Sequence, residues 1–301
     1  MSCRRADARK ERLVGTAEPE RRRTGPKLGI ARRLREGRVL AGVVLKMPAP
    51  ALAELAGHVG LDLIVLDTEH GPNGADLLEH HIRAADSADI PVLVRVKSND
   101  RTEILAALDA GAAGVIVPHV NNAQEAAAAV RAAHYPPLGD RGFAMSTRAG
   151  RYGTNRPERH IGDATERTIV VVQVEDVAAI PHVSEIAATT RLDAVWVGPS
   201  DLSMSLGRPL QYSHPEVVAA IDEIEAQIKS AHNARLCVIV RKESDARRWR
   251  RRGAGIVLFG AMEAIADRFA EFASDAIADE LRGGPLADGH VPAARTLPDF
   301  T

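Results

Sequence analysis

Eight short apolar runs alternate with helical segments from Val39 to about residue 270, and this alternation limits the possible folds more than any other feature. The runs are rich in Val, Ile and Leu and lie at Leu40–Leu45, Leu61–Leu66, Pro91–Val96, Gly114–Val117, Thr168–Val174, Ala194–Val197, Leu236–Val240 and Gly255–Phe259. The segments with helical patterning are Ala49–His58, Ala75–Ala88, Thr102–Ala110, Asn122–Ala133, Val177–Ala188, Pro215–His232, Ser244–Arg252 and Met262–Asp279. Strands that are apolar throughout are buried on both faces, as in a parallel sheet. Eight strand–helix units of this size predict a (β/α)8 TIM barrel.

An open, doubly wound sheet is the competing α/β fold, and it needs fewer strands than the chain offers. No Gly-x-Gly-x-x-Gly follows the first predicted strand, which disfavours dinucleotide binding.

The two ends of the chain differ from its centre. Residues 1–37 are rich in Arg, Lys and Glu and are predicted to be a basic, solvated extension, with a short helix over Gly29–Glu36. The barrel is assigned to residues 38–281, and residues 282–301 are predicted to be a disordered tail.

Composition excludes several classes of function. The 301 residues are 45% hydrophobic with a formal net charge of −1, which is unlike a nucleic-acid-binding or disordered chain. Aromatic residues make up 3%, too few for base-stacking surfaces. Cys3 and Cys237 suggest neither a disulfide framework nor a thiolate metal site, and no apolar stretch is long enough to span a membrane. A cytoplasmic protein is expected.

Polar residues follow the second predicted strand at the point where Gly71-Pro72 ends it. Ligands of parallel α/β folds bind at the carboxyl ends of the strands. His70 titrates near neutral pH, and carboxylates such as Asp67 could orient it as a base. An ordinary strand-to-helix turn with solvated polar residues is the alternative.

Three further strand ends carry polar residues that suit an anionic substrate and a metal. Arg95 interrupts an apolar run and needs an anionic partner or ligand. Gln173 and Glu175 are two residues apart, so both face the same side of their strand. Asp201 follows the next strand, so Glu175 and Asp201 form a two-carboxylate site typical of Mg²⁺ or Mn²⁺. For each carboxylate alone, a helix cap or a surface salt bridge is the simpler explanation.

Other candidates are weaker. The pair His80-His81 is expected at the surface of a helix. His119 follows a strand end and could line the mouth, but packing or the rim is the preferred interpretation. Arg148 lies in a long segment of irregular sequence, from His134 to His160, which could cover the substrate. Lys46 could form a Schiff base, but little supports it.

Seven short segments of the chain resemble the HpcH/HpaI aldolases, in the same order and with similar spacing, over about residues 38 to 265. They are Leu66-Asp-Thr-Glu-His-Gly-Pro, Val94-Arg-Val, Leu108-Asp-Ala-Gly-Ala, Val115-Ile-Val-Pro-His-Val, Tyr135-Pro-Pro-Leu-Gly-Asp-Arg-Gly, Gln173-Val-Glu and Gly198-Pro-Ser-Asp-Leu-Ser. The HpcH/HpaI aldolases are class II, metal-dependent pyruvate aldolases with a barrel of the phosphoenolpyruvate/pyruvate-binding type. Members of the family act, for example, on 4-hydroxy-2-oxoheptane-1,7-dioate or 2-dehydro-3-deoxyglucarate.

The resemblance implies a role for each matching residue. Glu175 and Asp201 would bind Mg²⁺, Mn²⁺ or Co²⁺, and Gln173 and Ser200 would contact the keto acid. His70 would accept a proton, Arg95 would stabilise an enolate, and Asp109 would raise the basicity of His70, a role that the sequence alone could equally give to Asp67. The implied reaction is reversible cleavage of a 4-hydroxy-2-oxo acid to pyruvate and an aldehyde by a carbon–carbon lyase, and a homohexamer is expected.

Departures from the family pattern concern the substrate more than the pyruvate chemistry. Arg241-Lys-Glu carries charge where the family has small or apolar residues, and Phe259-Gly-Ala-Met differs from the commoner ending of the last strand.

Three alternative functions stay open at this stage. A citrate-lyase-type enzyme would act on acyl-CoA thioesters, and another lyase or isomerase would act on phosphoenolpyruvate-like substrates. A non-catalytic barrel would hold a keto acid without turning it over.

Overall fold

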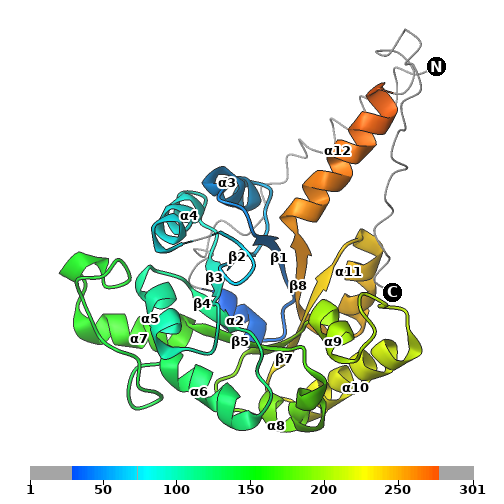
Figure 1. Cartoon of the computed structure of the whole chain (residues 1–301). Helices are drawn as coiled ribbons and strands as arrows, with labels where there is room; N and C mark the ends of the chain where they lie inside the picture. Colours follow the sequence, from blue (N-terminus) through cyan, green and yellow to red (C-terminus); the bar gives the residue numbers. More distant parts are fainter. Residues whose placement is uncertain (1–28, 73, 278–301) are drawn as a thin grey trace.

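Eight parallel strands close into a barrel in the computed structural model, which describes residues 29–72 and 74–277 (Figure 1). The strands are β1 (Leu40–Leu45), β2 (Leu63–Asp67), β3 (Val92–Arg95), β4 (Gly114–Val117), β5 (Ile169–Val174), β6 (Ala194–Val197), β7 (Arg235–Val240) and β8 (Ala254–Gly260). Each strand pairs with the next one along the chain, and β8 pairs with β1. The predicted (β/α)8 barrel is therefore confirmed.

Helices follow the strands and surround the barrel. They are α2 (Ile30–Arg35), α3 (Pro50–His58), α4 (Ala75–Ser87), α5 (Arg101–Asp109), α6 (Ala123–Ala133), α7 (Pro157–Arg167), α8 (Val183–Ala187), α9 (Pro199–Ser205), α10 (Pro215–Ala231), α11 (Glu243–Arg251) and α12 (Ala261–Ile277). Two 3₁₀ turns, η3 (Arg151–Gly153) and η4 (Val177–His182), complete the described elements. Among these helices, none is both long and apolar enough to cross a membrane.

Two elements differ from the sequence prediction for identifiable reasons. The single helix expected over Val177–Ala188 is divided into η4 and α8, since Pro181 lacks the N–H that a continuous helix needs. The long segment from His134 to His160 contains only the short turn η3 before Pro157, where α7 begins with proline in its first turn.

Alternate residues of each strand face the inside of the barrel. The interior cluster contains Leu40 and Val44 of β1, Leu63 and Val65 of β2, and Trp196 of β6. The intervening strand residues belong instead to the cluster between the sheet and the helices. Because this alternation has a period of two, it also predicts which residue of each strand end faces the barrel mouth.

Helix α2 closes the N-terminal end of the barrel. Ile30, Ala31 and Leu34 are buried and join the interior cluster. On the polar side of the helix, Arg33 pairs with Asp62 at 2.8 Å, and Arg35 pairs with Asp193 at 2.7 Å. Helix α2, which precedes the predicted boundary at residue 38, is therefore packed against the barrel.

The outermost segments of the chain lie beyond the described residues. The predictions for residues 1–28 and for the tail 282–301 fall there, as does the predicted end of the barrel at residue 281. The last described element, α12, extends away from the barrel body (Figure 1). Phe269 and Phe272 are exposed on this helix.

Candidate active site

The candidate site is the layer of polar residues just above the apolar interior, at the C-terminal ends of the strands. The inward alternation brings Asp67 of β2, Arg95 of β3 and Gln173 of β5 into this layer. All three side chains are buried, although they are polar or charged. A buried charge is stable only when it is paired, so the contacts among these residues decide what the site can do.

Arg95 is held on several sides by acceptors. Its Nε and Nη2 donate to Asp67 Oδ1 at 3.1 Å and Oδ2 at 2.5 Å, and its Nη1 lies 3.1 Å from Glu69 Oε2. Burial would lower the pKa of Arg95, but the hydrogen bonds and charge of Asp67 outweigh it and raise the pKa. Burial would raise the pKa of Asp67, and the same pairing with Arg95 holds it low. Arg95 is therefore a fixed cation.

A continuous chain of hydrogen bonds connects this cation to Glu175. Arg95 Nη1 donates to Gln173 Oε1 at 3.2 Å, and Gln173 Nε2 donates to Glu175 Oε2. A Cβ at position 198 would lie 2.6 Å from Glu175 Oε2 and 2.7 Å from Gln173 Nε2. Gly198 thus leaves the space in which these two side chains meet.

His119 contacts Glu175 from the neighbouring strand end. Its backbone N–H donates to Glu175 Oε1 at 3.0 Å, its Nδ1 lies 3.1 Å from the same oxygen, and its Nε2 lies 3.2 Å from Glu69 Oε1. The residue has a φ of 55°, in the left-handed region that side chains other than glycine seldom adopt. This turn directs both its backbone N–H and its ring to one carboxylate.

Glu69, His119 and Glu175 form a group that could hold a metal ion, since one ligand atom from each lies within 4.8 Å of the others. Burial raises the pKa of Glu175 to about 7, and the negative charges of Asp201 and Glu69 act in the same direction. Such a cluster of carboxylates is stabilised by a bound cation. The donor set of carboxylate oxygens and one imidazole therefore fits a divalent metal.

His70 stands at the edge of this layer. Its backbone N–H donates to Asp67 Oδ1 at 3.1 Å, and its Nε2 lies 3.8 Å from Glu69 Oε2. The side chain is half exposed, so it can meet both solvent and a substrate entering the mouth.

Ser200 and Asp201 lie in the first turn of α9, directly after β6. Ser200 Oγ lies 3.2 Å from the hydroxyl of Tyr212, and the charge of Asp201 acts on Glu175. The structure thus brings seven of the eight predicted residues to one end of the barrel. They are Asp67, His70, Arg95, Gln173, Glu175, Ser200 and Asp201.

Asp109 is the exception. It is the last residue of α5, and a helix of this fold ends beside the start of the following strand, at the opposite end of the barrel. Arg141 Nη2 donates to its Oδ1 at 2.8 Å. Within one chain, Asp109 is not placed to act on His70.

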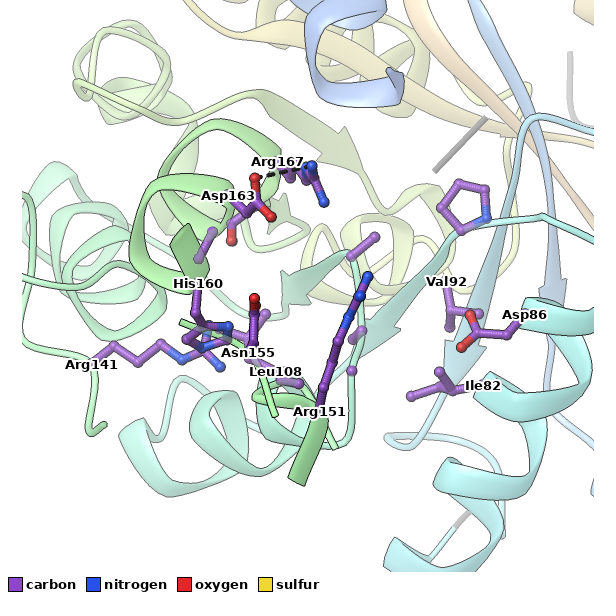
Figure 2. A pocket seen from close by; sticks show the side chains of 17 residues that line it. Ile82, Asp86, Val92, Leu108, Arg141, Arg151, Asn155, His160, Asp163 and Arg167 are labelled. Atoms are coloured by element: carbon purple, nitrogen blue, oxygen red, sulfur yellow. Dashed lines mark ion pairs between the residues drawn. The ribbon is translucent and has the colours of Figure 1, made fainter. Parts of the chain in front are cut away.

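A cavity of about 220 Å³ lies at this opposite end (Figure 2). Arg141, His160 and Asp86 line it together with Val92, the first residue of β3, and Arg148 binds Asp86 there. The cavity is therefore distinct from the polar layer of the mouth, and Arg148 is held away from that layer.

The prediction that His81 lies at the surface is wrong. His81 is fully buried, its Nε2 accepts from Ala49 N–H at 3.0 Å and its Nδ1 donates to the Leu77 carbonyl at 2.7 Å. It connects α4 to the start of α3, whereas its neighbour His80 is exposed.

Sequence reasoning missed two residues of the site. Glu69 stands inside the Asp67-Thr-Glu-His segment but receives no function of its own from the sequence, and for His119 a place at the mouth is the less favoured alternative to packing or the rim. The available signal is that each lies two residues past the end of a strand, and these strand ends meet at the mouth.

Comparison with known proteins agrees with this geometry. Residues 41–264 match the HpcH/HpaI aldolase/citrate lyase family. The chain belongs to this family. The family suggested by the sequence motifs is thus confirmed, and members of this family depend in general on a metal.

Curated relatives and a solved structure extend the comparison. The chain is 41% identical over 206 residues to a hydroxypyruvate/pyruvate aldolase of Sagittula stellata, covering 68% of this chain and 80% of that protein. It is 36% identical over 215 residues to a 5-keto-4-deoxy-D-glucarate aldolase of Salmonella paratyphi C, covering 71% and 83%. A family member from Burkholderia cenocepacia has a TM-score of 0.77 at 31% identity, covering 83% of this chain and 98% of that one.

Proposed function

We propose that the protein is a metal-dependent aldolase that reversibly cleaves a 4-hydroxy-2-oxo acid to pyruvate and an aldehyde. The observation that carries this proposal is the chain from Arg95 through Gln173 to Glu175, which joins a fixed cation to a metal-binding carboxylate. The aldolase names of relatives at 36% and 41% identity support the same reaction class, a carbon–carbon lyase.

Glu175 and Asp201 are the proposed metal ligands, with Glu69 and His119 beside them. A bound Mg²⁺, Mn²⁺ or Co²⁺ would supply Lewis-acid polarisation of the keto group. Gln173 and Ser200 are proposed to contact the keto-acid end of the substrate, since Gln173 is fixed between Arg95 and Glu175 and Ser200 lies in the first turn of α9.

His70 is the proposed proton acceptor. It takes the proton of the C4 hydroxyl, directly or through a water molecule, as the C3–C4 bond breaks. The electron pair of that bond moves to the enolate oxygen of the nascent pyruvate, and a proton from His70 or from water then adds to C3 to form the methyl group of pyruvate. In the reverse direction His70 returns the proton to the new hydroxyl.

Arg95 is proposed to stabilise the enolate oxygen. Its pairing with Asp67, Glu69 and Gln173 fixes the guanidinium before the substrate arrives, so little reorganisation accompanies the reaction. Asp67 therefore acts as a positioning residue for both Arg95 and the backbone of His70.

The predicted homohexamer and cytoplasmic location stay predictions. One observation supports an assembly of several copies: Phe269 and Phe272 are exposed on α12. If Asp109 assists His70 as the resemblance implies, it must do so in the site of a neighbouring copy.

Exchange of the methyl protons of pyruvate in D₂O, followed by NMR, tests the proposal without knowledge of the aldehyde. We expect exchange with Mg²⁺ or Mn²⁺, none with EDTA, none in Glu175→Gln, and slower exchange in His70→Gln. Asp176→Asn is the matched control, because Asp176 is the next residue and caps η4 instead.

Absence of exchange in folded protein that binds the metal would contradict the aldolase proposal. Turnover of an acyl-CoA thioester would then favour the citrate-lyase type, and turnover of a phosphoenolpyruvate-like substrate would favour that lyase or isomerase class. Binding of pyruvate without any turnover would favour a keto-acid-binding protein.

A further inference from the structure

Trp196 is the aromatic member of the barrel interior. It lies in β6, is 3% exposed and belongs to the interior cluster, whose other members are Ile, Leu, Val, Ala and Cys residues. It pairs in register with Gln173 of β5, so it stands at the level where the apolar interior meets the polar layer. The indole is thus part of the floor of the candidate site.

The indole lies against the guanidinium of Arg95. The Arg95 Cζ is 5.3 Å from the centroid of the Trp196 ring, which is within the range of a cation–π contact. The two residues come from strands that are not neighbours, since β4 and β5 lie between β3 and β6. Tryptophan, the largest side chain, bridges this separation across the interior.

The hydrogen bonds of Arg95 and the Trp196 ring restrict different motions. Three hydrogen bonds run from the guanidinium to Asp67 and Gln173. Because the N–H groups of a guanidinium point outward in its own plane, these bonds fix its position within that plane and oppose a tilt of the plane less strongly. An aromatic ring against one face of the group opposes the tilt.

A packing role alone does not explain a tryptophan at this position. Its Nε1 is buried and has no hydrogen-bond partner among the residues that the structure describes. A buried N–H without an acceptor destabilises a fold, and aliphatic residues fill most other positions of the interior without that cost. The aromatic face is what an aliphatic residue lacks, so the contact with Arg95 supplies a reason for the tryptophan.

We propose that Trp196 is a positioning residue that holds the guanidinium of Arg95 in the orientation that stabilises the enolate. This inference rests on the proposed aldol reaction. Negative charge arises on the enolate oxygen during the reaction, and donors that already point to that oxygen stabilise it most. Loss of the ring should therefore lower the rate and leave the binding of pyruvate nearly unchanged.

Exchange of the methyl protons of pyruvate in D₂O tests this role in Trp196→Leu and Trp196→Phe. Leucine removes the aromatic face, and phenylalanine keeps a weaker one. For each variant the kcat and KM of exchange and the Mn²⁺ dissociation constant are measured. Trp249→Leu is the matched control, because Trp249 is the other tryptophan of the chain and its ring lies 4.6 Å from Arg252 Cζ on α11.

We expect the kcat of exchange to fall about 10-fold in Trp196→Leu and about threefold in Trp196→Phe. The KM for pyruvate and the Mn²⁺ dissociation constant should stay within about threefold of the parent, as should every value in Trp249→Leu. An unchanged kcat in Trp196→Leu would overturn the proposal. A Mn²⁺ affinity that falls with the rate would also overturn it, since the effect would then run through the metal ligands.

A second comparison separates positioning from structural support. In a protein that carries Arg95→Met and Asp67→Asn, which lacks the guanidinium and its counter-charge, Trp196→Leu should change the residual rate of exchange less than about twofold. An equal fall with and without Arg95 would overturn the proposal. If Trp196→Leu does not fold, Trp196→Met takes its place in both comparisons, since methionine fills irregular space. Absence of exchange in the unaltered, metal-loaded protein would instead overturn the aldol reaction itself.

Discussion

Asp67 binds Arg95 through two parallel hydrogen bonds, from Nε to Oδ1 at 3.1 Å and from Nη2 to Oδ2 at 2.5 Å, and both side chains are buried. The pair connects β2 to β3 at the level where the apolar interior ends. It is thus part of the packing and part of the site at once.

Substitutions of Arg95 and Asp67 should affect the stability of the fold and the rate of pyruvate exchange differently. Arg95→Met leaves the Asp67 carboxylate buried without its counter-charge, and we expect a loss of about 3–5 kcal/mol in the free energy of unfolding. The rate of pyruvate exchange should fall about 100- to 1,000-fold. Adding Asp67→Asn should recover much of the stability and none of the rate. Urea unfolding and exchange on the same samples measure both, and recovery of the rate would contradict the role of Arg95.

The stability of the metal-free protein should depend on the protonation of Glu175. Burial, assisted by Asp201 and Glu69, raises its pKa from 4.5 to about 7 in the folded state. Between these values the folded chain holds a proton that the unfolded chain has lost, so stability falls as pH rises from about 4.5 to 7.

A divalent cation takes the place of that proton, so the increase in Tm on adding Mn²⁺ should grow over the same pH range. In Glu175→Gln both the pH slope and the metal effect should be strongly reduced. Thermal unfolding from pH 4.5 to 8, with Mn²⁺ and with EDTA, measures this. An unchanged slope in the variant would mean that another group titrates.

His119 and His70 should differ in their effect on the metal. His119 contacts Glu175 and Glu69, so His119→Gln should weaken Mn²⁺ binding about 10- to 100-fold. His70→Gln, which has no contact with Glu175 among the described residues, should keep the affinity within about threefold and slow pyruvate exchange. Titration of free Mn²⁺ by electron paramagnetic resonance compares the two. Equal affinities in both variants would contradict a role for His119 at the metal.

Gly198→Ala tests the space around Glu175. The added methyl group would lie 2.6 Å from Glu175 Oε2, closer than two such atoms can approach, so the carboxylate must move. The φ of Gly198 is −92°, which alanine adopts without strain, so the fold should be retained. We expect a loss of Mn²⁺ affinity and of exchange with little change in circular dichroism. Alanine at the open position Gly162 is the control, because no atom lies near its Cβ.

The barrel could be predicted from the sequence because its signal is local. Each strand is an apolar run of its own, and Leu40–Leu45, Gly114–Val117 and Ala194–Val197 were placed with their observed bounds. The mouth residues followed from the same reasoning, since the ends of parallel strands meet at one end of the barrel.

The missing parts of the site depend on contacts between distant residues. Nothing near His119 indicates the left-handed turn that directs its ring to Glu175, 56 residues later. The helical pattern around His81 does not show that Ala49 N–H needs an acceptor. The place of Asp109 at the opposite end of the barrel could have been deduced, since helices of this fold return toward the strand starts. The matching sequence motif alone does not show at which end of the barrel a residue lies.

The anchoring of α2 has a consequence for how the chain is made. Arg35 binds Asp193, which is synthesised 158 residues later, and the carbonyls of Glu166 and Thr168. At about 5–20 residues per second, a ribosome needs roughly 10–30 s to reach that partner. Until then the barrel is incomplete, so the side chains of Ile30 and Leu34 have no apolar interior against which to pack. A segment that is made before every strand of the barrel thus completes the fold only after most of the barrel has left the ribosome.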